Sequence, residues 1–253
     1  MNLSGHNKHM TKKIPITAIN GVEFSSSDLV NIVQVRVVDR NGLSKLSWDR
    51  FVRLQATANC VVQPENQTAA KLLDVGGYDG ALALFLAGYN VELLDPETTG
   101  GTAMAIAALD QAYEVVTAVD VLEHIAPEER SSALKECARI TSKQLVLNYP
   151  CQESAAAQEL MLKLTGNSLI KQHVEWPLPD TDWVVKTLEE LDFQVEVIKH
   201  TSVAIWLGQY LVQNLLPEVS AELNKFLIEK HSAEPFNVPL YHLVSAIRVG
   251  AQR

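Results

Sequence analysis

Residues 72–80 read LLDVGGYDG and place an acid and glycines directly after a short apolar run. Glycine lets the backbone turn tightly and approach a ligand without a Cβ in the way. The dinucleotide fingerprint G-x-G-x-x-G fits poorly, because it needs glycine at positions 78 and 81. The pattern D-x-G-x-G-x-G is met at Asp74, Gly76 and Gly80 and is missed at Tyr78. The segment therefore predicts a ligand-binding glycine loop that follows a strand.

Two further acids stand at the ends of apolar runs. Asp95 follows residues 90–94, and Asp120 follows residues 114–119. An acid at the position of Asp95 can accept hydrogen bonds from the hydroxyls of a ribose. Acids at successive strand ends suit a ligand that carries ribose and positive charge but no phosphate. The alternative is that these acids only cap helices or terminate strands.

Histidine is the candidate general base, because it titrates near neutrality. His124 lies in the sequence DVLEH, and His173 stands beside Glu175 in the sequence HVEWPLP. Both could take a proton from a hydroxyl acceptor. The alternatives are that His124 packs structurally and that His173 is a solvated histidine of a surface segment.

Alternating apolar and amphipathic segments are expected to position these residues. Strands are predicted at 71–75, 90–94, 114–119, 144–149, 194–199 and 241–249. Helices are predicted at 29–59, where they form a cap ahead of the main domain, and at 81–87, 127–140, 180–191 and 203–230. The first 23 residues are polar and are expected to be frayed. The alternation predicts a mostly parallel sheet with helices on both faces and a ligand beyond the carboxyl ends of the strands.

Composition limits the function classes. The chain has 253 residues, of which 47% are hydrophobic, so it can bury a sizeable core. Its net charge of −9 argues against a general nucleic-acid binder, because neutralising phosphates needs a surplus of Lys and Arg. Three cysteines without a CxxC pair indicate reduced thiols, and no apolar run reaches the length of a membrane span. We expect a soluble cytoplasmic protein.

Residues 72–150 resemble the class I S-adenosylmethionine-dependent methyltransferases, in particular the group with a D-x-L-E-H signature, which stands here at 120–124. The resemblance implies an α/β fold, a Rossmann-like three-layer sandwich. Its seven-stranded, mostly parallel sheet would end in an antiparallel C-terminal hairpin, with added helices. We expect an N-terminal tail and helical cap at 1–60 and a methyltransferase domain at 61–253. Helical insertions are expected near 153–178 and 203–233.

S-adenosyl-L-methionine is the cofactor that the resemblance implies. The glycine loop would border its methionine part, Asp74 would lie near its amino group, and Asp95 would bind its ribose. The expected cofactor-binding residues are Asp74, Gly76, Gly77, Tyr78, Gly80, Asp95, Pro96, Asp120, Val121 and Leu122. The interval between Asp95 and Glu114 is too short for a helix and a full strand. The adenine is therefore expected near residues 104–109.

The segment 173–179 looks like the part of this group that lies over the active site. Asp120, Glu123 and His124 also resemble an acid-x-x-Glu-His arrangement that binds a divalent metal in some quinone-biosynthesis O-methyltransferases. Carboxylate and imidazole ligands would suit Mg²⁺ or Mn²⁺. Our main expectation is that no metal is bound, and this set of residues is the alternative.

We expect a methyltransferase that acts on a small or medium metabolite, mainly at oxygen, with a glycan or lipid precursor as the acceptor. The apolar segment 203–230 would receive a lipid-like substrate or form a homodimer contact. Aromatic residues would line the acceptor pocket or simply pack in the core; they are Trp176, Trp183, Trp206, Tyr210 and Phe226.

Two alternatives remain at this stage. A non-catalytic binding protein could retain the fold, and the altered glycine loop favours it. An NAD or nucleotide-sugar oxidoreductase would need the missing glycines and, in one common form, a Tyr-x-x-x-Lys motif that the chain lacks.

Overall fold

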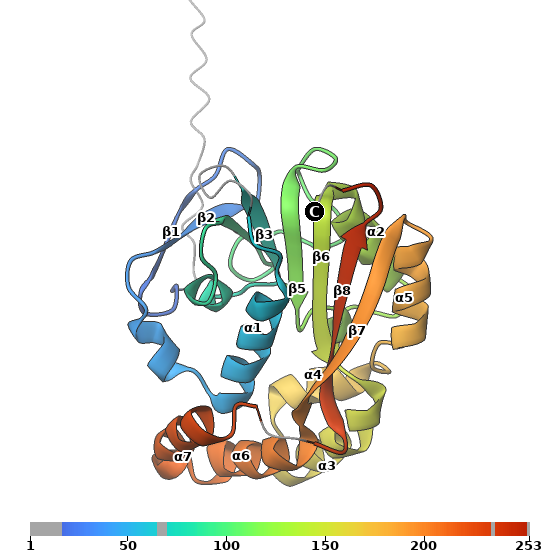
Figure 1. Ribbon diagram of the computed structural model, residues 1–253. Coiled ribbons are helices and arrows are strands. Elements are labelled where there is room, and N and C mark those ends of the chain that lie inside the picture. The colour runs from blue at the N-terminus through green and yellow to red at the C-terminus, as the bar shows by residue number, and fades with distance from the viewer. Residues whose placement is uncertain (1–16, 65–69, 234–235, 252–253) are drawn as a thin grey trace, which may run out of the picture.

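A single mixed sheet forms the centre of the protein, and helices cover both of its faces (Figure 1). The computed structural model describes residues 17–64, 70–233 and 236–251. The strand order is β1-β2-β4-β3-β5-β6-β8-β7. The strands are β1 (Val22–Ser26), β2 (Val33–Val37), β3 (Lys71–Val75), β4 (Asn90–Leu94), β5 (Tyr113–Val119), β6 (Thr141–Pro150), β7 (Phe193–Ser202) and β8 (Pro239–Arg248).

The helices fall into two groups, one against the sheet faces and one at the end of the sheet (Figure 1). The α-helices are α1 (Trp48–Cys60), α2 (Arg130–Ile140), α3 (Ala155–Thr165), α4 (Ser168–Glu175), α5 (Thr181–Glu189), α6 (Val203–Leu215) and α7 (Pro217–Lys230). The 3-10 turns are η1 (Asn41–Lys45), η2 (Ala81–Leu84), η3 (Leu122–His124) and η4 (Gln152–Ser154).

Strands β4, β3, β5 and β6 run parallel and form the middle of the sheet. Their side chains alternate between two cores. Leu73 and Val75 join the core beneath α2 and α5, whereas Leu72 joins the core on the side of α1. Because both faces are covered, these strands read as nearly continuous apolar runs. The antiparallel pair β8 and β7 completes the sheet, so the predicted Rossmann-like sheet with an antiparallel C-terminal pair is confirmed.

The sheet has eight strands, so the prediction of seven was wrong. An N-terminal hairpin of β1 and β2 extends one side of the sheet. Its strand β2 pairs antiparallel with β1 and with β4. The segment VQVRV alternates apolar and polar residues with period two, which is a strand pattern. It was read as part of a helical cap at 29–59, and within that range the structure has only η1 and α1 as helical elements. Residues 1–16 lie outside the described part of the chain.

The predicted helix at 81–87 is also wrong, because only the 3-10 turn η2 forms there. Its four residues are all buried beneath the N-terminal hairpin. Gly88, at φ +80°, then turns the chain toward β4. No helix or strand forms between β4 and β5 in the described chain, where an isolated bridge joins Thr102 to Ala105.

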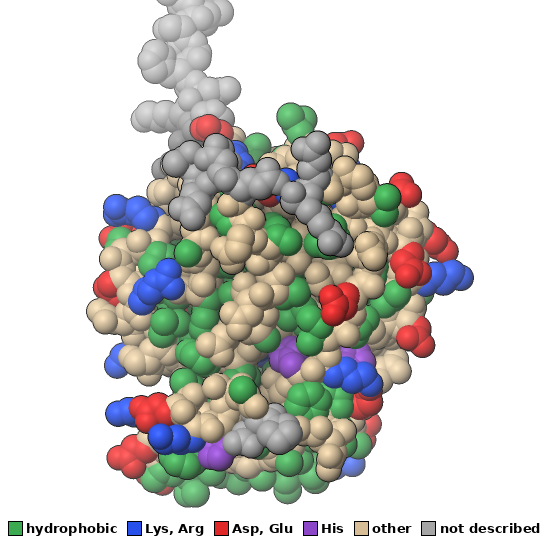
Figure 2. Space-filling model, viewed as in Figure 1, with side chains coloured by type: hydrophobic (Ala, Val, Ile, Leu, Met, Phe, Trp, Pro, Cys, Tyr) green, Lys and Arg blue, Asp and Glu red, His purple; other side chains and the backbone are tan. Residues whose placement is uncertain are grey.

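Helices α3, α4, α6 and α7 form a group that is called the helical cap from here on and is distinct from the N-terminal cap predicted at 29–59. It lies beyond the carboxyl ends of β5 and β6 (Figure 1). A third apolar cluster fills it and includes Trp48, Met161, Trp206 and Tyr241. Among the described residues, none of the helices combines the length and apolar character that crossing a bilayer requires. On the face seen in Figure 2, Lys and Arg side chains are dispersed among Asp and Glu.

Candidate functional site

The three acids singled out in the sequence lie at one end of the sheet, where the central parallel strands have their carboxyl ends; this end is called the sheet edge below. Asp95 follows β4, Asp120 follows β5, and Asp74 is the next-to-last residue of β3, which lies between them. Val75 pairs with Leu94 on one side and with Ala118 on the other. The carboxyl ends of three neighbouring parallel strands therefore meet at this edge, where α/β proteins bind ligands.

The glycine loop makes the turn that its composition predicts. Gly76 and Gly80 have φ angles of +75° and +79°, which glycine adopts without strain. A Cβ at Gly77 would collide with the Oδ2 of Asp74, so this position also needs glycine. Tyr78 takes a φ of +49°, an uncommon value for a residue with a side chain. Its side chain is 46% exposed, so the ring is not packed into the core.

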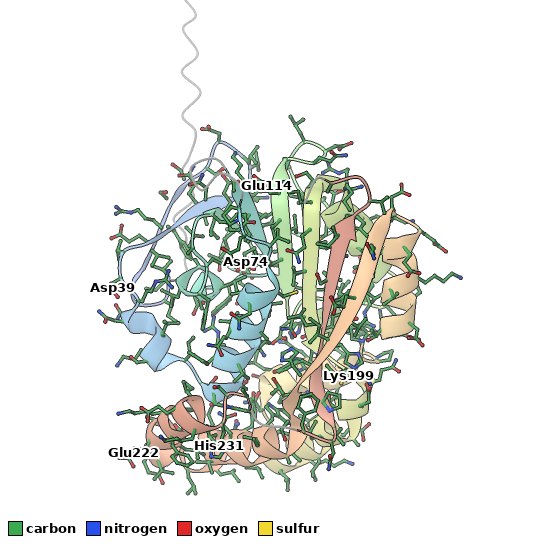
Figure 3. All side chains as sticks on the ribbon, in the orientation of Figure 1. Asp39, Asp74, Glu114, Lys199, Glu222 and His231 are labelled. Carbon is green, nitrogen blue, oxygen red and sulfur yellow. The ribbon has the colours of Figure 1, made fainter. Side chains whose placement is uncertain are left out.

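Asp74 is buried at the base of the glycine loop (Figure 3). Its Oδ1 accepts a hydrogen bond of 2.9 Å from the Oγ1 of Thr117 on β5. Burial raises the pKa of this carboxyl to about 7, against the effect of the Thr117 hydrogen bond, and the charges of Asp79 and Asp95 raise it further. A cationic group bound above the loop would favour the ionised form of Asp74.

Asp95 is also buried, and it holds its own loop together. Its Oδ1 accepts from the backbone N–H groups of Glu97 at 2.9 Å and Thr98 at 2.8 Å. The Thr98 hydroxyl in turn donates to the Tyr78 carbonyl at 2.6 Å. The loop after β4 is therefore closed directly onto the glycine loop. Pro96, the next residue, is exposed.

Asp120 is paired with an arginine that the sequence reasoning missed. Its Oδ2 lies 2.5 Å from the Nη1 of Arg53 on α1, and both side chains are mostly buried. The same Nη1 donates to the Tyr241 hydroxyl at 2.8 Å. Arg53 sits on an ordinary amphipathic helix, and no motif in the sequence marks it. Only the tertiary packing of α1 against the sheet brings it to Asp120.

A polar chain continues from Tyr241 beneath α1. The His200 ring stacks on the Tyr241 ring with centroids 5.4 Å apart. The Nε2 of His200 lies 3.2 Å from the Oδ1 of Asn148 on β6, and the Asn148 amide donates to the Thr57 hydroxyl at 3.0 Å. Burial lowers the pKa of His200 to about 3. None of these residues was identified from the sequence, because they come from strands and helices far apart along the chain.

Of the remaining expected residues, Val121 and Leu122 lie next to the loop. A Cβ at Gly76 would be 2.5 Å from the Cγ2 of Val121, so the loops after β3 and β5 are in close contact. Leu122 is buried in the core on the α2 side of the sheet. Gly80 faces the N-terminal hairpin, since a Cβ there would be 3.0 Å from the Phe24 ring.

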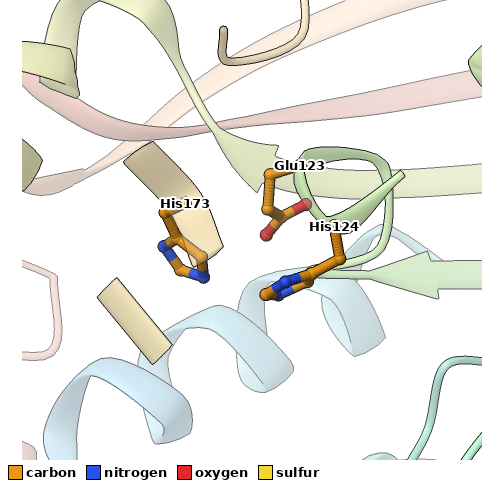
Figure 4. Close-up of side chains that lie close together, drawn as sticks. All are labelled: Glu123, His124 and His173. Carbon is orange, nitrogen blue, oxygen red and sulfur yellow. The ribbon is translucent and has the colours of Figure 1, made fainter. Parts of the chain in front are cut away.

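The two candidate bases are brought together in space (Figure 4). His124 ends η3, whereas His173 lies on α4, a helix that begins where the Asn167 side chain accepts from two backbone N–H groups. The two rings meet edge to face with centroids 4.9 Å apart. Burial lowers the pKa of His173 to about 3. His124 is the more exposed of the pair.

Glu123 lies between these histidines and is completely buried. Within the part of the chain that the structure describes, neither of its carboxylate oxygens receives a hydrogen bond. Burial raises the pKa of Glu123 well above its ordinary value, and the nearby charge of Asp120 raises it further. Glu123, His124 and His173 are therefore brought together, whereas Asp120 is occupied by Arg53.

Two of the aromatic candidates, Trp206 and Tyr210, pack against each other in the helical cap. Phe226, on the neighbouring helix α7, is 53% exposed. A cavity of about 270 Å³ lies between α1, the end of β7 and the start of α6, and Trp48 and His200 are among the residues that line it. No residue of the glycine loop lines this cavity.

Searches against protein-family models and against curated proteins find no match. The chain is similar to the solved structure of a candidate methyltransferase from an antibiotic biosynthesis pathway of Anabaena variabilis, at 14% identity and a TM-score of 0.52, over 82% of this chain and 100% of that chain. It is also similar to an S-adenosylmethionine-dependent methyltransferase from Thermotoga maritima, at 13% identity and a TM-score of 0.48, over 81% and 91% of the two chains. A third similar structure is the cyclase SpnF, at 15% identity and a TM-score of 0.49, over 81% and 83%.

The Anabaena structure shows that the chain shares the α/β fold of that protein. At this level of identity, the similarity shows the fold alone.

Proposed function

We propose that this protein is an S-adenosylmethionine-dependent methyltransferase that acts at an oxygen atom of a small or medium metabolite. The observation that carries the proposal is the position of Asp74, Asp95 and the glycine loop at the carboxyl ends of adjacent parallel strands. Carboxylates there complement the ribose hydroxyls and the positive charges of the cofactor. The proposal includes a glycan or lipid precursor as the acceptor, as expected from the resemblance.

The residues at this edge fit the cofactor in its chemistry. The loop requires glycine where it passes Asp74, so the backbone has no side chain on that side. Asp74 is a buried carboxyl without a cationic partner among its hydrogen bonds, and an ammonium group would supply one. Asp95 would exchange its bonds to the backbone of its own loop for bonds to ribose hydroxyls.

S-adenosylmethionine supplies an activated methyl group, which an acceptor oxygen takes in an in-line displacement. The protein's contribution to such a reaction is mainly alignment and exclusion of water. A hydroxyl acceptor also loses a proton, and His124 is the better placed histidine to receive it. His173 is a weaker base, because burial lowers its pKa to about 3. Its place on α4 suits it to position His124 through the contact between their rings.

A second candidate function, a non-catalytic protein on this fold, is favoured by one specific observation. The Thr98 hydroxyl binds the Tyr78 carbonyl, and this contact joins the loops after β3 and β4 directly. A cofactor that binds between these two loops would have to open this contact. A protein that has lost the cofactor would keep it closed.

Calorimetric titration with S-adenosylmethionine and with S-adenosylhomocysteine separates these functions. We expect saturable binding of both ligands, and we expect Asp95→Ala to abolish it because the ribose contact is lost. Glu97→Ala is the matched control, since Glu97 lies in the same loop and only its backbone N–H bonds to Asp95. The affinity of Glu97→Ala for both ligands should equal that of the wild type.

Absence of binding by a folded wild-type protein would support the non-catalytic function. Tighter binding of NAD than of S-adenosylmethionine would instead support the oxidoreductase alternative. Once binding is shown, transfer of a labelled methyl group to fractionated glycan and lipid precursors identifies the acceptor. In that assay His124→Ala should lower turnover more than His173→Ala.

A further inference from the structure

In the described chain, neither oxygen of the completely enclosed Glu123 carboxyl group receives a hydrogen bond. Its neighbour Asp120 is also a carboxyl group, so the two can pair only when one of them is protonated. Buried polar groups in proteins are nearly always paired, and an exception points to strain, to catalysis or to an ion that binds there. An ionised Glu123 therefore needs a cationic partner.

The candidate partner is a metal ion, because two imidazoles converge on the same carboxylate (Figure 4). One carboxylate oxygen of Glu123 and one ring nitrogen each of His124 and His173 all lie within 4.8 Å of one another. Ligand atoms around Zn²⁺ at about 2.0–2.1 Å are roughly 3.3 Å apart in a tetrahedron. Small side-chain rotations would therefore bring the three groups to ligand distance.

The ion pair of Asp120 favours this set over one that includes Asp120. The carboxylate of Asp120 is already paired with Arg53, so its Oδ2 is not free to bind an ion. Glu123 then supplies the single anionic ligand. His124 is exposed enough to leave a path for an ion to enter.

We propose that Glu123, His124 and His173 form a binding site for a divalent transition-metal ion of the Zn²⁺ type. Two imidazoles and one carboxylate suit Zn²⁺, Co²⁺ or Fe²⁺, whereas Mg²⁺ and Ca²⁺ prefer oxygen ligands throughout. The set differs from the one expected from the sequence, because it replaces Asp120 with His173. A bound ion would occupy the basic nitrogen of His124, so His124 would accept a proton from the acceptor only in the metal-free protein. Since η3 follows β5 and α4 belongs to the helical cap, a bound ion would tie the cap to the sheet edge.

A second cluster in the described chain, formed by Cys151, Glu153 and His242, serves as a comparison. Its carboxylate is paired with Lys199 at 2.8 Å, and its thiol contacts the Pro239 carbonyl at 3.2 Å. The Nδ1 of His242 lies 2.8 Å from the Thr181 hydroxyl. The carboxylate, the thiol and the Nδ1 of His242 already have partners, and the Nε2 of His242 lies 3.4 Å from the same Glu153 carboxylate, so we assign no ion to this cluster.

The test measures Zn²⁺ binding to the full chain after treatment with a chelator, without cofactor or acceptor. Competition with a chromophoric chelator should show one equivalent bound per chain, and Co²⁺ should give visible absorption bands of a low-coordinate site. His173→Gln, His124→Gln and Glu123→Gln should each weaken binding at least about tenfold, since even second-shell changes have effects of that size. His242→Gln is the matched control and should bind as the wild type does.

Circular dichroism confirms that each variant is folded, and three independent substitutions keep the test decisive if one of them fails to fold. The proposal is wrong if the wild type binds no stoichiometric Zn²⁺. It is equally wrong if all three variants bind normally, or if His242→Gln removes the binding. Binding of S-adenosylmethionine is measured separately on metal-free protein, so failure of one proposal leaves the other standing.

Discussion

At the scale of single residues, the site is built from carboxyl groups that are buried before any ligand arrives. Among the described residues, Asp74 accepts a hydrogen bond from the neutral Thr117 hydroxyl, and the charge of Arg50 only partly offsets the effect of burial on its pKa. A buried carboxyl in such surroundings favours its protonated form. The folded state therefore bears a cost at neutral pH that a bound cationic ligand would relieve. Burial likewise raises the pKa of Glu123 well above its ordinary value.

This cost predicts how Asp74 affects stability across pH. Burial raises the pKa of Asp74 from 3.8 to about 7 in the folded protein, so between these values the folded state keeps a proton that the unfolded state releases. Stability therefore falls as the pH rises through this window, by up to about 1.4 kcal/mol per pH unit from this group. Asp74→Asn cannot ionise and should lack this loss. Urea unfolding of both proteins at about pH 5 and about pH 7 measures it.

The difference in unfolding free energy between Asp74→Asn and the wild type should grow in favour of the variant as the pH rises. Thr117→Val provides a second check, because it removes the hydrogen bond that favours the ionised carboxylate. In the wild-type background, Thr117→Val should increase the fall in unfolding free energy between about pH 5 and about pH 7. A difference that stays constant with pH would show that Asp74 ionises normally.

At the scale of elements, the ion pair between Arg53 and Asp120 joins α1 to the end of β5. Removing one member leaves the other charge mostly buried without its partner. Arg53→Met should therefore lower the unfolding free energy by about 3 kcal/mol, the lower end of the range for buried pairs, because both groups keep some exposure. Combining it with Asp120→Asn should recover much of the loss. Chemical denaturation of the two single variants and the double variant measures the coupling.

The exposed pair between Arg36 and Glu23 on the N-terminal hairpin is the internal control. Both of its side chains are more than half exposed, so Arg36→Met should cost less than about 1 kcal/mol. Equal losses for Arg53→Met and Arg36→Met would contradict a special role for the pair at the site.

Some helices and strands could be predicted from local sequence patterns. Strands β3 and β4 were predicted with their observed bounds, because buried parallel strands give compact apolar runs. A helix was predicted to begin at Asp180, and the structure shows this residue capping α5, since its Oδ1 accepts from the N–H groups of Asp182 and Trp183. Such signals are local, and local signals can be read without knowing the fold.

What the sequence did not reveal depends on contacts between distant segments. Arg53 and Tyr241 meet because α1 and β8 pack together, and neither residue stands in a recognisable motif. The strand β2 was hidden because it is short and was read within a longer helical pattern. His124 and His173 were both named as candidate bases, but their contact depends on the packing of α4 against η3.

At the scale of the whole molecule, the sheet and the helical cap meet at the proposed site. The cap has its own apolar cluster, in which Trp206 is 2% exposed and packs against Tyr210. The edge with Asp95 and the glycine loop depends instead on the sheet and the N-terminal hairpin. Stability of the cap and binding of the cofactor should therefore be separable.

Thermal unfolding with and without S-adenosylmethionine tests this separation. A ligand at 100 times its Kd should stabilise the folded wild type by about 2.7 kcal/mol. Trp206→Ala should lower the basal stability by about 3–5 kcal/mol, because it empties a large packed volume in the cap. It should nevertheless keep the ligand-induced rise in Tm. Asp95→Ala should lose that rise, and its basal Tm should fall less than that of Trp206→Ala, because it leaves two backbone N–H groups without their acceptor. If Trp206→Ala also loses the rise while remaining folded, the cap itself forms part of the cofactor site, and the division between sheet edge and cap is wrong.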